Sequence, residues 1–130
     1  MLKKFLWIAL GGLFLLAIAG LVILGKDTQG RDRRRMVEDA RPHRGGPAIV
    51  RHGCSACHVV GGIRKATGRV GPKLPDIHEQ IYIGGVLPNN PENLVRWIRF
   101  PQTFSPGTAM PDLGVSEQAA RDITAYLYEN

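Results

Sequence analysis

Residues 54–58 read Cys-Ser-Ala-Cys-His, and this short segment constrains the chain more than any other. Cys54 and Cys57 are the only two cysteines in the sequence, and His58 directly follows the second. The spacing is typical of a c-type haem attachment site, where each thiol forms a thioether with one vinyl group. The adjacent imidazole can then bind the iron. The segment therefore predicts one covalent haem c held by Cys54 and Cys57, with His58 as an axial ligand.

Three other uses of these residues fit the sequence less well. A disulfide between Cys54 and Cys57 would be strained and would leave His58 unexplained. A thioredoxin-like redox pair belongs beside a βαβ pattern, which is not visible here. A zinc site usually takes four ligands, whereas this segment supplies three and no second Cys/His cluster follows it. Haem attachment is the interpretation that accounts for all three residues.

The positive charge of the chain is concentrated at its N-terminal end. The net charge is +6, from 17 basic and 11 acidic residues. From residue 45 onward there are eight basic and seven acidic residues, so the remaining nine basic and four acidic residues lie in the first 44 positions. A nucleic-acid-binding domain would carry a basic face on its folded part. We therefore expect no nucleic-acid partner.

A long apolar stretch starts at Phe5 and ends at Leu24, and these twenty residues carry no charge. As a helix they would span about 30 Å, the thickness of the hydrocarbon core of a bilayer. We therefore predict a membrane anchor over residues 1–25, a charged linker over residues 26–44 and a folded domain over residues 45–130. The predicted membrane contact is the stretch of residues 5–24.

A cleaved signal peptide is the alternative for this stretch. Ala17 and Ala19 resemble a small-residue cleavage site, but the apolar run continues to Leu24, which favours an uncleaved anchor. Both interpretations send the C-terminal part across the membrane. The basic residues conflict with this direction, because two precede the stretch and five follow it between residues 26 and 35, the reverse of the positive-inside rule.

The predicted domain contains several short helices joined by long loops. Pro47 suits the first turn of a helix that leads into the haem motif, and a second short helix is predicted over residues 77–81. Asn90 can cap a third helix that starts at Pro91 and ends before Pro101. Residues 102–114 are predicted as a loop, and Ser116 caps a final helix to about residue 129. A few short helices bury too little apolar surface to form a complete hydrophobic core, and a large apolar cofactor would complete that core.

A second axial ligand is expected if the haem iron carries electrons without binding substrate. The candidates are Met110, His78, His52 and His43. Met110 lies in a stiff Pro-Gly-Thr-Ala-Met-Pro loop, far enough along the chain to reach the opposite face of the haem. His52 is too close to the motif for that, and His43 falls in the predicted linker. A thioether is a suitable soft ligand, so Met110 is the predicted one.

The haem motif, the loop around Met110 and the Ala-Tyr-Leu ending at residues 125–127 together resemble class I cytochromes c. The resemblance covers residues 46–130 and implies an all-α cytochrome c fold wrapped around one haem. It implies that Gly46 and Val50 lie where the first helix crosses the last. Residues 87–114 are most similar to the cytochrome c domains associated with subunit II of haem–copper oxidases.

The resemblance also implies roles for individual residues. The carbonyl of Pro72 would accept a hydrogen bond from His58, and Trp97 and Thr108 would contact the haem propionates. Residue 109 is alanine, where mitochondrial cytochromes carry a lysine, so a mitochondrial type of electrostatic docking is not expected. Because c-type haems of this family are attached outside the cytoplasm, the domain is expected on the periplasmic side of the inner membrane.

The predicted function is that of a monohaem electron carrier and not of an enzyme. It would pass single electrons from a quinol-oxidising complex to a terminal oxidase in a respiratory chain. The alternative is a fixed haem relay subunit within a larger membrane oxidase or reductase. A peroxidase or sensor would need an open coordination site and a distal acid–base pair, and Met110 would close that site.

Overall fold

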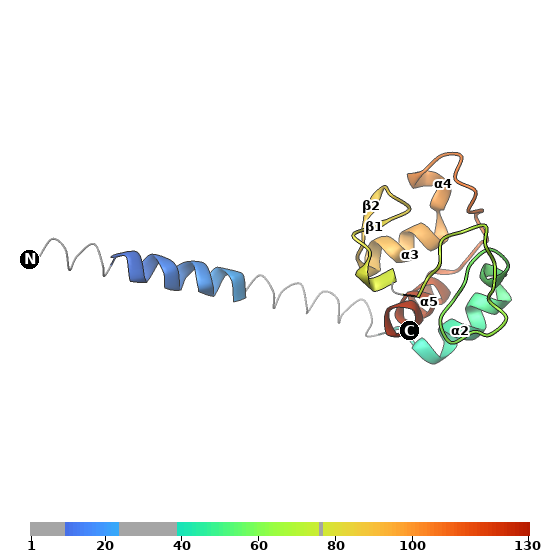
Figure 1. The fold of residues 1–130 in the computed structure, drawn as a ribbon, viewed down its shortest axis with the longest axis horizontal. Helices are drawn as coiled ribbons and strands as arrows, with labels where there is room; N and C mark the ends of the chain where they lie inside the picture. The colour runs from blue at the N-terminus through green and yellow to red at the C-terminus, as the bar shows by residue number, and fades with distance from the viewer. Residues whose placement is uncertain (1–9, 24–38, 76) are drawn as a thin grey trace, which may run out of the picture. The chain divides into compact units, whose positions relative to one another are not determined.

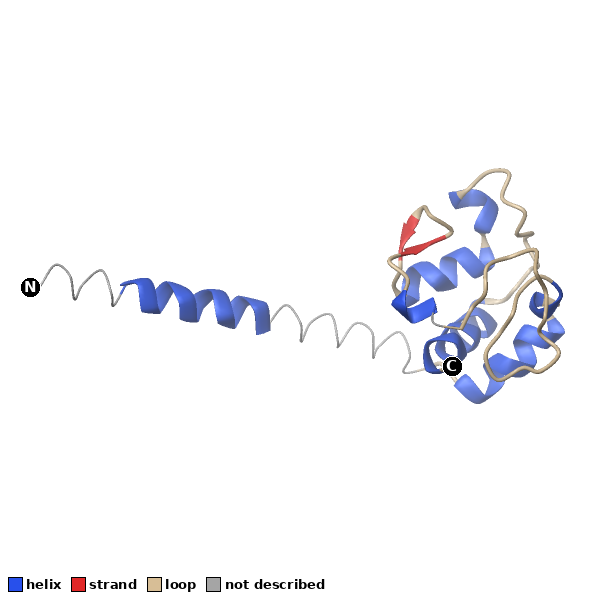
Figure 2. Ribbon diagram, in the orientation of Figure 1, coloured by secondary structure: helices blue, strands red, loops and turns tan. Residues whose placement is uncertain are grey.

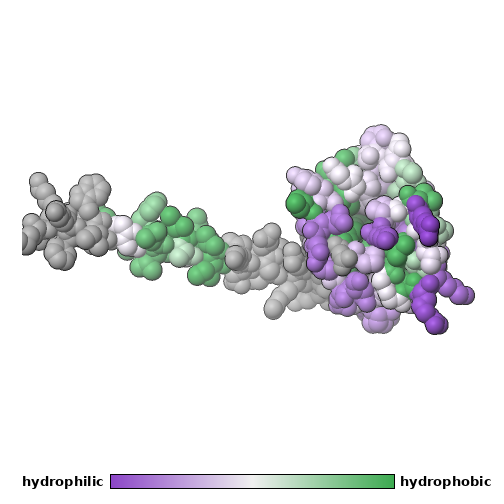
Figure 3. Space-filling model, in the orientation of Figure 1, coloured by the Kyte–Doolittle hydropathy of each residue, from purple (hydrophilic) through white to green (hydrophobic). Residues whose placement is uncertain are grey.

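The computed structural model describes residues 10–23, 39–75 and 77–130, and the chain divides into two compact units, residues 1–34 and 35–130. Residues 10–23 of the first unit are helical, and their surface is almost entirely hydrophobic (Figure 3). No helix among the described residues is long and apolar enough to cross a membrane. Residues 5–9 and 24 of the predicted span lie outside the described residues, as do residues 26–38 of the predicted linker.

The second unit is mostly helical, as predicted, with loops between the helices (Figure 2). Its elements, in chain order, are α2 (Pro42–Arg51), η1 (Cys54–Ala56), η2 (Ile77–Glu79), β1 (Tyr82–Ile83), β2 (Leu87–Pro88), α3 (Pro91–Arg99), α4 (Pro101–Phe104) and α5 (Glu117–Glu129), where η marks a single 3₁₀ turn (Figure 1). Both α2 and α3 pack against α5, which makes the C-terminal helix the centre of the domain.

Helices α2 and α5 approach each other closely at two glycines. A Cβ atom on Gly45 would meet the backbone of Asp122 and the Cβ of Tyr126, and one on Gly46 would lie 3.2 Å from the Tyr126 ring. Glycine permits such an approach because it has no side chain to displace. The expectation for Val50 was wrong: this residue is 55% exposed, whereas the buried apolar side chains of the helix are those of Ala48, at 4%, and Ile49, at 1%.

The first helix begins earlier than predicted. Pro42 occupies its first turn, and Pro47 lies inside the helix. Both prolines suit a helix start, because a first-turn N–H has no helical partner to lose. A tertiary contact favours the start at Pro42 over a start at Pro47. The carboxylate of Asp122 on α5 accepts a hydrogen bond from the N–H of Arg41, the residue that precedes the helix.

The boundaries of α3 and α5 agree with the predictions. The side chain of Asn90 accepts a hydrogen bond from the N–H of Asn93 at 2.8 Å, and that of Ser116 accepts one from the N–H of Ala119 at 3.3 Å. These bonds satisfy N–H groups that would otherwise lack partners at a helix start. The predicted loop of residues 102–114 was wrong at its beginning, because Pro101 starts the short helix α4.

The antiparallel pair β1–β2 was not predicted. Gly84, at its turn, has a φ of +56°, a left-handed conformation that favours glycine. A Cβ on Gly84 would also strike the ring of Trp97 on α3. The hairpin therefore covers Trp97 because residue 84 is glycine. The predicted helix over residues 77–81 is shorter than expected, a single 3₁₀ turn at Ile77–Glu79.

Candidate functional site

A cavity of about 460 Å³ lies in the middle of the domain, within the usual size range of cofactor sites. Its walls come from α2, α3 and α5 and from the loops between them. Most of the lining is apolar, and it includes five buried aliphatic residues: Ile49, Leu94, Ile98, Ile123 and Leu127. The helices thus do not fill the centre of the domain with their own side chains.

Every residue that the sequence singled out for haem binding lines this cavity. These residues are Cys54, Cys57, His58, Pro72, Trp97, Thr108 and Met110. They come from four separate stretches of the chain, and the fold brings them to one place.

The ring of His58 is oriented by the loop that follows the haem motif. Its Nδ1 atom lies 2.7 Å from the carbonyl oxygen of Pro72. A carbonyl can only accept, so Nδ1 donates and carries the proton in this arrangement. The Nε2 atom then keeps its lone pair, which is the form of imidazole that binds a metal. This is the contact that the resemblance assigned to Pro72.

Gly71 allows the loop to pass over His58. A Cβ atom at residue 71 would lie 2.6 Å from Nδ1 and 2.8 Å from Nε2 of His58, far inside van der Waals contact. The loop is also fixed by its backbone, because the N–H groups of Val70 and Gly71 both donate to the carbonyl of Cys57. Glycine at position 71 is therefore a steric requirement of the site.

The two cysteines lie at the 3₁₀ turn η1 and are not joined in a disulfide. Gly53, with a φ of +72°, starts the turn, and the N–H of His58 donates to the carbonyl of Cys54 at 2.9 Å. Burial raises the pKa of the Cys54 thiol, a backbone hydrogen bond opposes this shift, and the neighbouring Cys57 adds to it.

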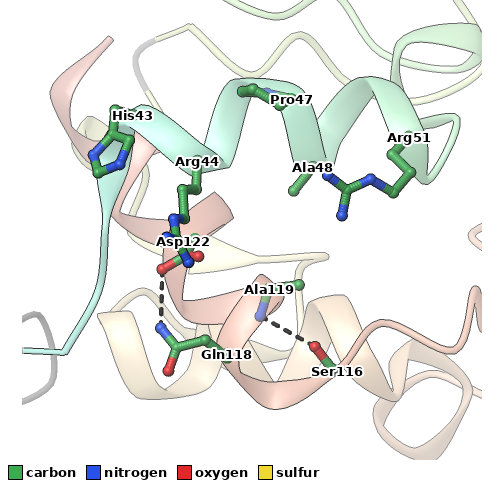
Figure 4. A pocket seen from close by; sticks show the side chains of 9 residues that line it. All are labelled: His43, Arg44, Pro47, Ala48, Arg51, Ser116, Gln118, Ala119 and Asp122. Carbon is green, nitrogen blue, oxygen red and sulfur yellow. Dashed lines mark hydrogen bonds between the residues drawn. The ribbon is translucent and has the colours of Figure 1, made fainter.

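The other candidate ligands differ in position. Met110 is partly buried and lines the cavity. His52 also lines it, beside the haem motif, whereas His78 is exposed and is not part of the lining. His43 belongs to α2, not to the predicted linker, and points toward a separate cavity of about 520 Å³ between α2 and α5 (Figure 4).

Sequence reasoning missed Gln102, whose side chain hydrogen-bonds to the loop that carries Met110. Nothing in the local pattern singles out this residue, because its partners are backbone atoms five to eight residues away. It also missed Gly71 as the residue that makes room for the His58 ring. At that place the resemblance assigned a role to Pro72 and none to the preceding glycine.

These residues fit a covalently held haem c. The two thiols, the oriented imidazole and the thioether of Met110 all reach one apolar cavity, and a glycine keeps the backbone clear of the imidazole. Apolar walls suit a porphyrin, and nitrogen and thioether sulfur suit its iron. The fold and the site together define a small helical domain that binds haem c.

Comparison with known proteins leads to the same class. The family model described as cytochrome c matches residues 44–129, which is 86 of the 130 residues. The chain belongs to the cytochrome c family.

Two relatives carry the same domain. Cytochrome c oxidase subunit 2 of Alkalihalophilus pseudofirmus is 37% identical over 86 residues, covering 65% of this chain and 24% of the relative. The same subunit of Bacillus sp. strain PS3 is 35% identical over 86 residues, covering 63% and 24%. The chain thus spans about a quarter of the length of these relatives. No solved structure gives a significant match.

Proposed function

We propose that this protein is a monohaem electron carrier in which Cys54 and Cys57 would hold the haem and His58 and Met110 would bind its iron. The observation that carries the proposal is the convergence of these four side chains on one apolar cavity. When bound, the haem iron supplies reversible one-electron chemistry. Two protein ligands leave no position for a substrate, so the site supports electron transfer and not substrate turnover.

The chain's own residues set the conditions for that chemistry. The thioether of Met110 and the buried walls of the cavity both favour the ferrous state, which raises the reduction potential. Pro72 holds the His58 ring in place. Trp97, which is 9% exposed, and Thr108 line the cavity where the resemblance expects contacts to the propionates.

The ligand assignment is tested on the ferric protein by its methionine-to-iron charge-transfer band. We expect wild type to show this band and Met110→Ala to lose it, with a fall in midpoint potential. His52→Ala is the matched control, because His52 also lines the cavity, and it keeps the band. Persistence of the band in Met110→Ala would overturn the assignment.

The N-terminal stretch of residues 5–24 is proposed as an uncleaved single-pass anchor that keeps the haem domain on the outer face of the cytoplasmic membrane. Its support is the uncharged run of twenty residues and the extracytoplasmic attachment of c-type haems. An anchor would raise the concentration of the domain near its membrane partners. The intact mass of the protein isolated from membranes tests this. The mass of the full chain plus one haem supports the anchor, and loss of the first 19 or so residues contradicts it.

The proposed acceptor is a terminal oxidase, and the proposed donor is a quinol-oxidising complex. The relatives carry this domain within a subunit of cytochrome c oxidase, which supports the oxidase as the acceptor. The same fact supports a second candidate, a fixed relay subunit of an oxidase. Gentle solubilisation of the membrane separates the two: migration of the haem protein alone supports a carrier, and stable co-migration with a large complex supports a subunit.

A further inference from the structure

Gln102, on the short helix α4, reaches across to the loop that carries Met110. Its Nε2 atom donates to the carbonyl oxygens of Thr108, at 2.7 Å, and of Met110, at 3.0 Å. Its Oε1 atom accepts from the N–H of Gly107 at 3.1 Å. The nitrogen and the oxygen of one side-chain amide thus both bind the backbone of residues 107–110.

The loop around Met110 has no helix or strand to hold it. Residues 105–115 lie between α4 and α5 outside any regular element. Within the loop, the N–H of Thr108 donates to the carbonyl of Ser105 at 3.0 Å, and the N–H of Met110 approaches the Thr108 hydroxyl at 3.4 Å. The N–H of Ser105, at the start of the loop, donates to the carbonyl of Pro101 in α4. Among the described residues, the bonds from Gln102 are the ones that connect residues 107–110 of the loop to that helix.

We propose that Gln102 is a positioning residue for Met110, a role that rests on the proposed ligation of the iron by that thioether. By holding the carbonyls of residues 108 and 110, Gln102 keeps the loop closed, so that the Met110 side chain stays at the cavity. Loss of these bonds would raise the fraction of molecules in which the loop is open and the thioether is withdrawn.

The chemistry of glutamine explains why another residue would not serve. The loop offers one N–H donor and two carbonyl acceptors at this point, and a primary amide supplies one acceptor and two donor hydrogens. Glutamate keeps the acceptor but has no donor, and its charge would face two carbonyl oxygens. Leucine has a similar size and neither group.

The test measures binding of imidazole to the ferric haem protein, because imidazole can reach the iron only when Met110 has left it. The apparent dissociation constant of imidazole is inversely proportional to the fraction of molecules with an open loop, so a larger open fraction gives tighter binding. The variants are Gln102→Leu and Gln102→Glu. Thr103→Ala is the matched control on the same helix, because Thr103 is exposed and takes no part in these bonds. Met110→Ala gives the limit of a fully open site.

We expect Gln102→Leu to bind imidazole about tenfold more tightly than wild type, since three hydrogen bonds of modest net strength are lost. Gln102→Glu is expected to bind it more tightly too. Both variants keep the helical circular dichroism of wild type and lower the midpoint potential. Thr103→Ala stays within about twofold of wild type in affinity, a change too small to signify a lost bond.

An affinity of Gln102→Leu within about twofold of wild type overturns the proposal. If that variant does not fold around the haem, Gln102→Glu decides the question by the same criterion. Failure of the ligand assignment looks different: wild type itself would lack the methionine band and bind imidazole as tightly as Met110→Ala. If Gln102 only stabilised the domain, its substitution would lower the free energy of unfolding and leave the imidazole affinity unchanged. That result also overturns the proposal.

Discussion

The backbone N–H of Arg41 donates a hydrogen bond of 2.8 Å to the carboxylate of Asp122, 81 residues further along the chain. Asp122 lies on α5 with 5% of its surface exposed, and the amide of Gln118 donates to the same Oδ1 atom at 3.0 Å (Figure 4). Arg41 is the N-cap of α2 and makes no side-chain cap bond of its own, and Asp122 binds the N–H of this N-cap residue from another helix. The contact joins the first and last helices of the domain.

Replacement of Asp122 by alanine is therefore expected to destabilise the domain by about 1–3 kcal/mol, because it leaves a partly buried N–H without a partner. It also removes a negative charge from the positive end of α2. Asp122→Asn keeps the accepting oxygen and is expected to cost less. Urea unfolding of the haem-loaded protein measures both.

Asp112→Ala is the control for this comparison, because the exposed carboxylate of Asp112 accepts only from the nearby N–H of Gly114 among the described residues. We expect this control to change the free energy of unfolding by less than about 1 kcal/mol. An equal loss in Asp112→Ala and Asp122→Ala would contradict the role given to Asp122.

Gly71→Ala tests the space beside His58. The new methyl group would overlap the imidazole, so either the ring or the loop must move, at a cost of about 1–3 kcal/mol. Movement would weaken the bond from His58 to Pro72, and we expect a shifted midpoint potential as well as lower stability. Gly85→Ala is the control for a loss of stability without a clash at His58, because Gly85 has a φ of +75°, which strains an alanine, and open space around it. That control is expected to lose about 1 kcal/mol of stability and to keep the wild-type potential.

Glu117 makes a pH-dependent contribution to stability. A hydrogen bond from Arg121 and the charges of Arg121 and Arg99 lower the pKa of Glu117 in the folded protein. The ionised carboxylate thus favours the folded state. The contribution is complete above the ordinary glutamate pKa of about 4.3, and it is lost as the pH falls through the lower, folded value.

Wild type is accordingly expected to be slightly more stable than Glu117→Gln at pH 7, by a margin that disappears in acid and shrinks in high salt. The margin is small because the side chains of Glu117 and Arg121 are 52% and 31% exposed. Thermal unfolding at pH 7 and near pH 3 measures it, with Glu79→Gln as an exposed control. A margin that grows in acid would contradict the assignment.

The parts of the fold that depend on local chemistry were predictable. Two helix starts are marked by residues within one turn of the helix. Asn90 and Pro91 mark the start of α3, Ser116 marks the start of α5, and the structure agrees with both. The haem motif was equally local, and its residues lie together in the cavity. The start of α2 was different: Pro42 and Pro47 both suit a first turn, and the choice depends on Asp122, which a local pattern cannot reveal.

The remaining details of the site depend on contacts between distant segments. The strands β1 and β2 have two residues each, too short for an alternating pattern, and the hairpin depends on Gly84 fitting over Trp97. The sequence placed Met110 in a stiff loop but could not show what closes that loop. The amide of Gln102 became visible only with the backbone of residues 107–110 in place.

Thr124 provides a test in which a substitution should increase stability. The residue is 2% exposed on α5, and its hydroxyl has no hydrogen-bond partner among the described residues. A buried hydroxyl without a partner costs free energy that valine, of nearly the same shape, does not. We expect Thr124→Val to stabilise the domain by about 1 kcal/mol in urea unfolding, and exposed Thr103→Val to change stability by less than half of that. Destabilisation by Thr124→Val would show that the hydroxyl has a partner, such as a buried water molecule in the adjacent cavity of about 210 Å³ between α3 and α5.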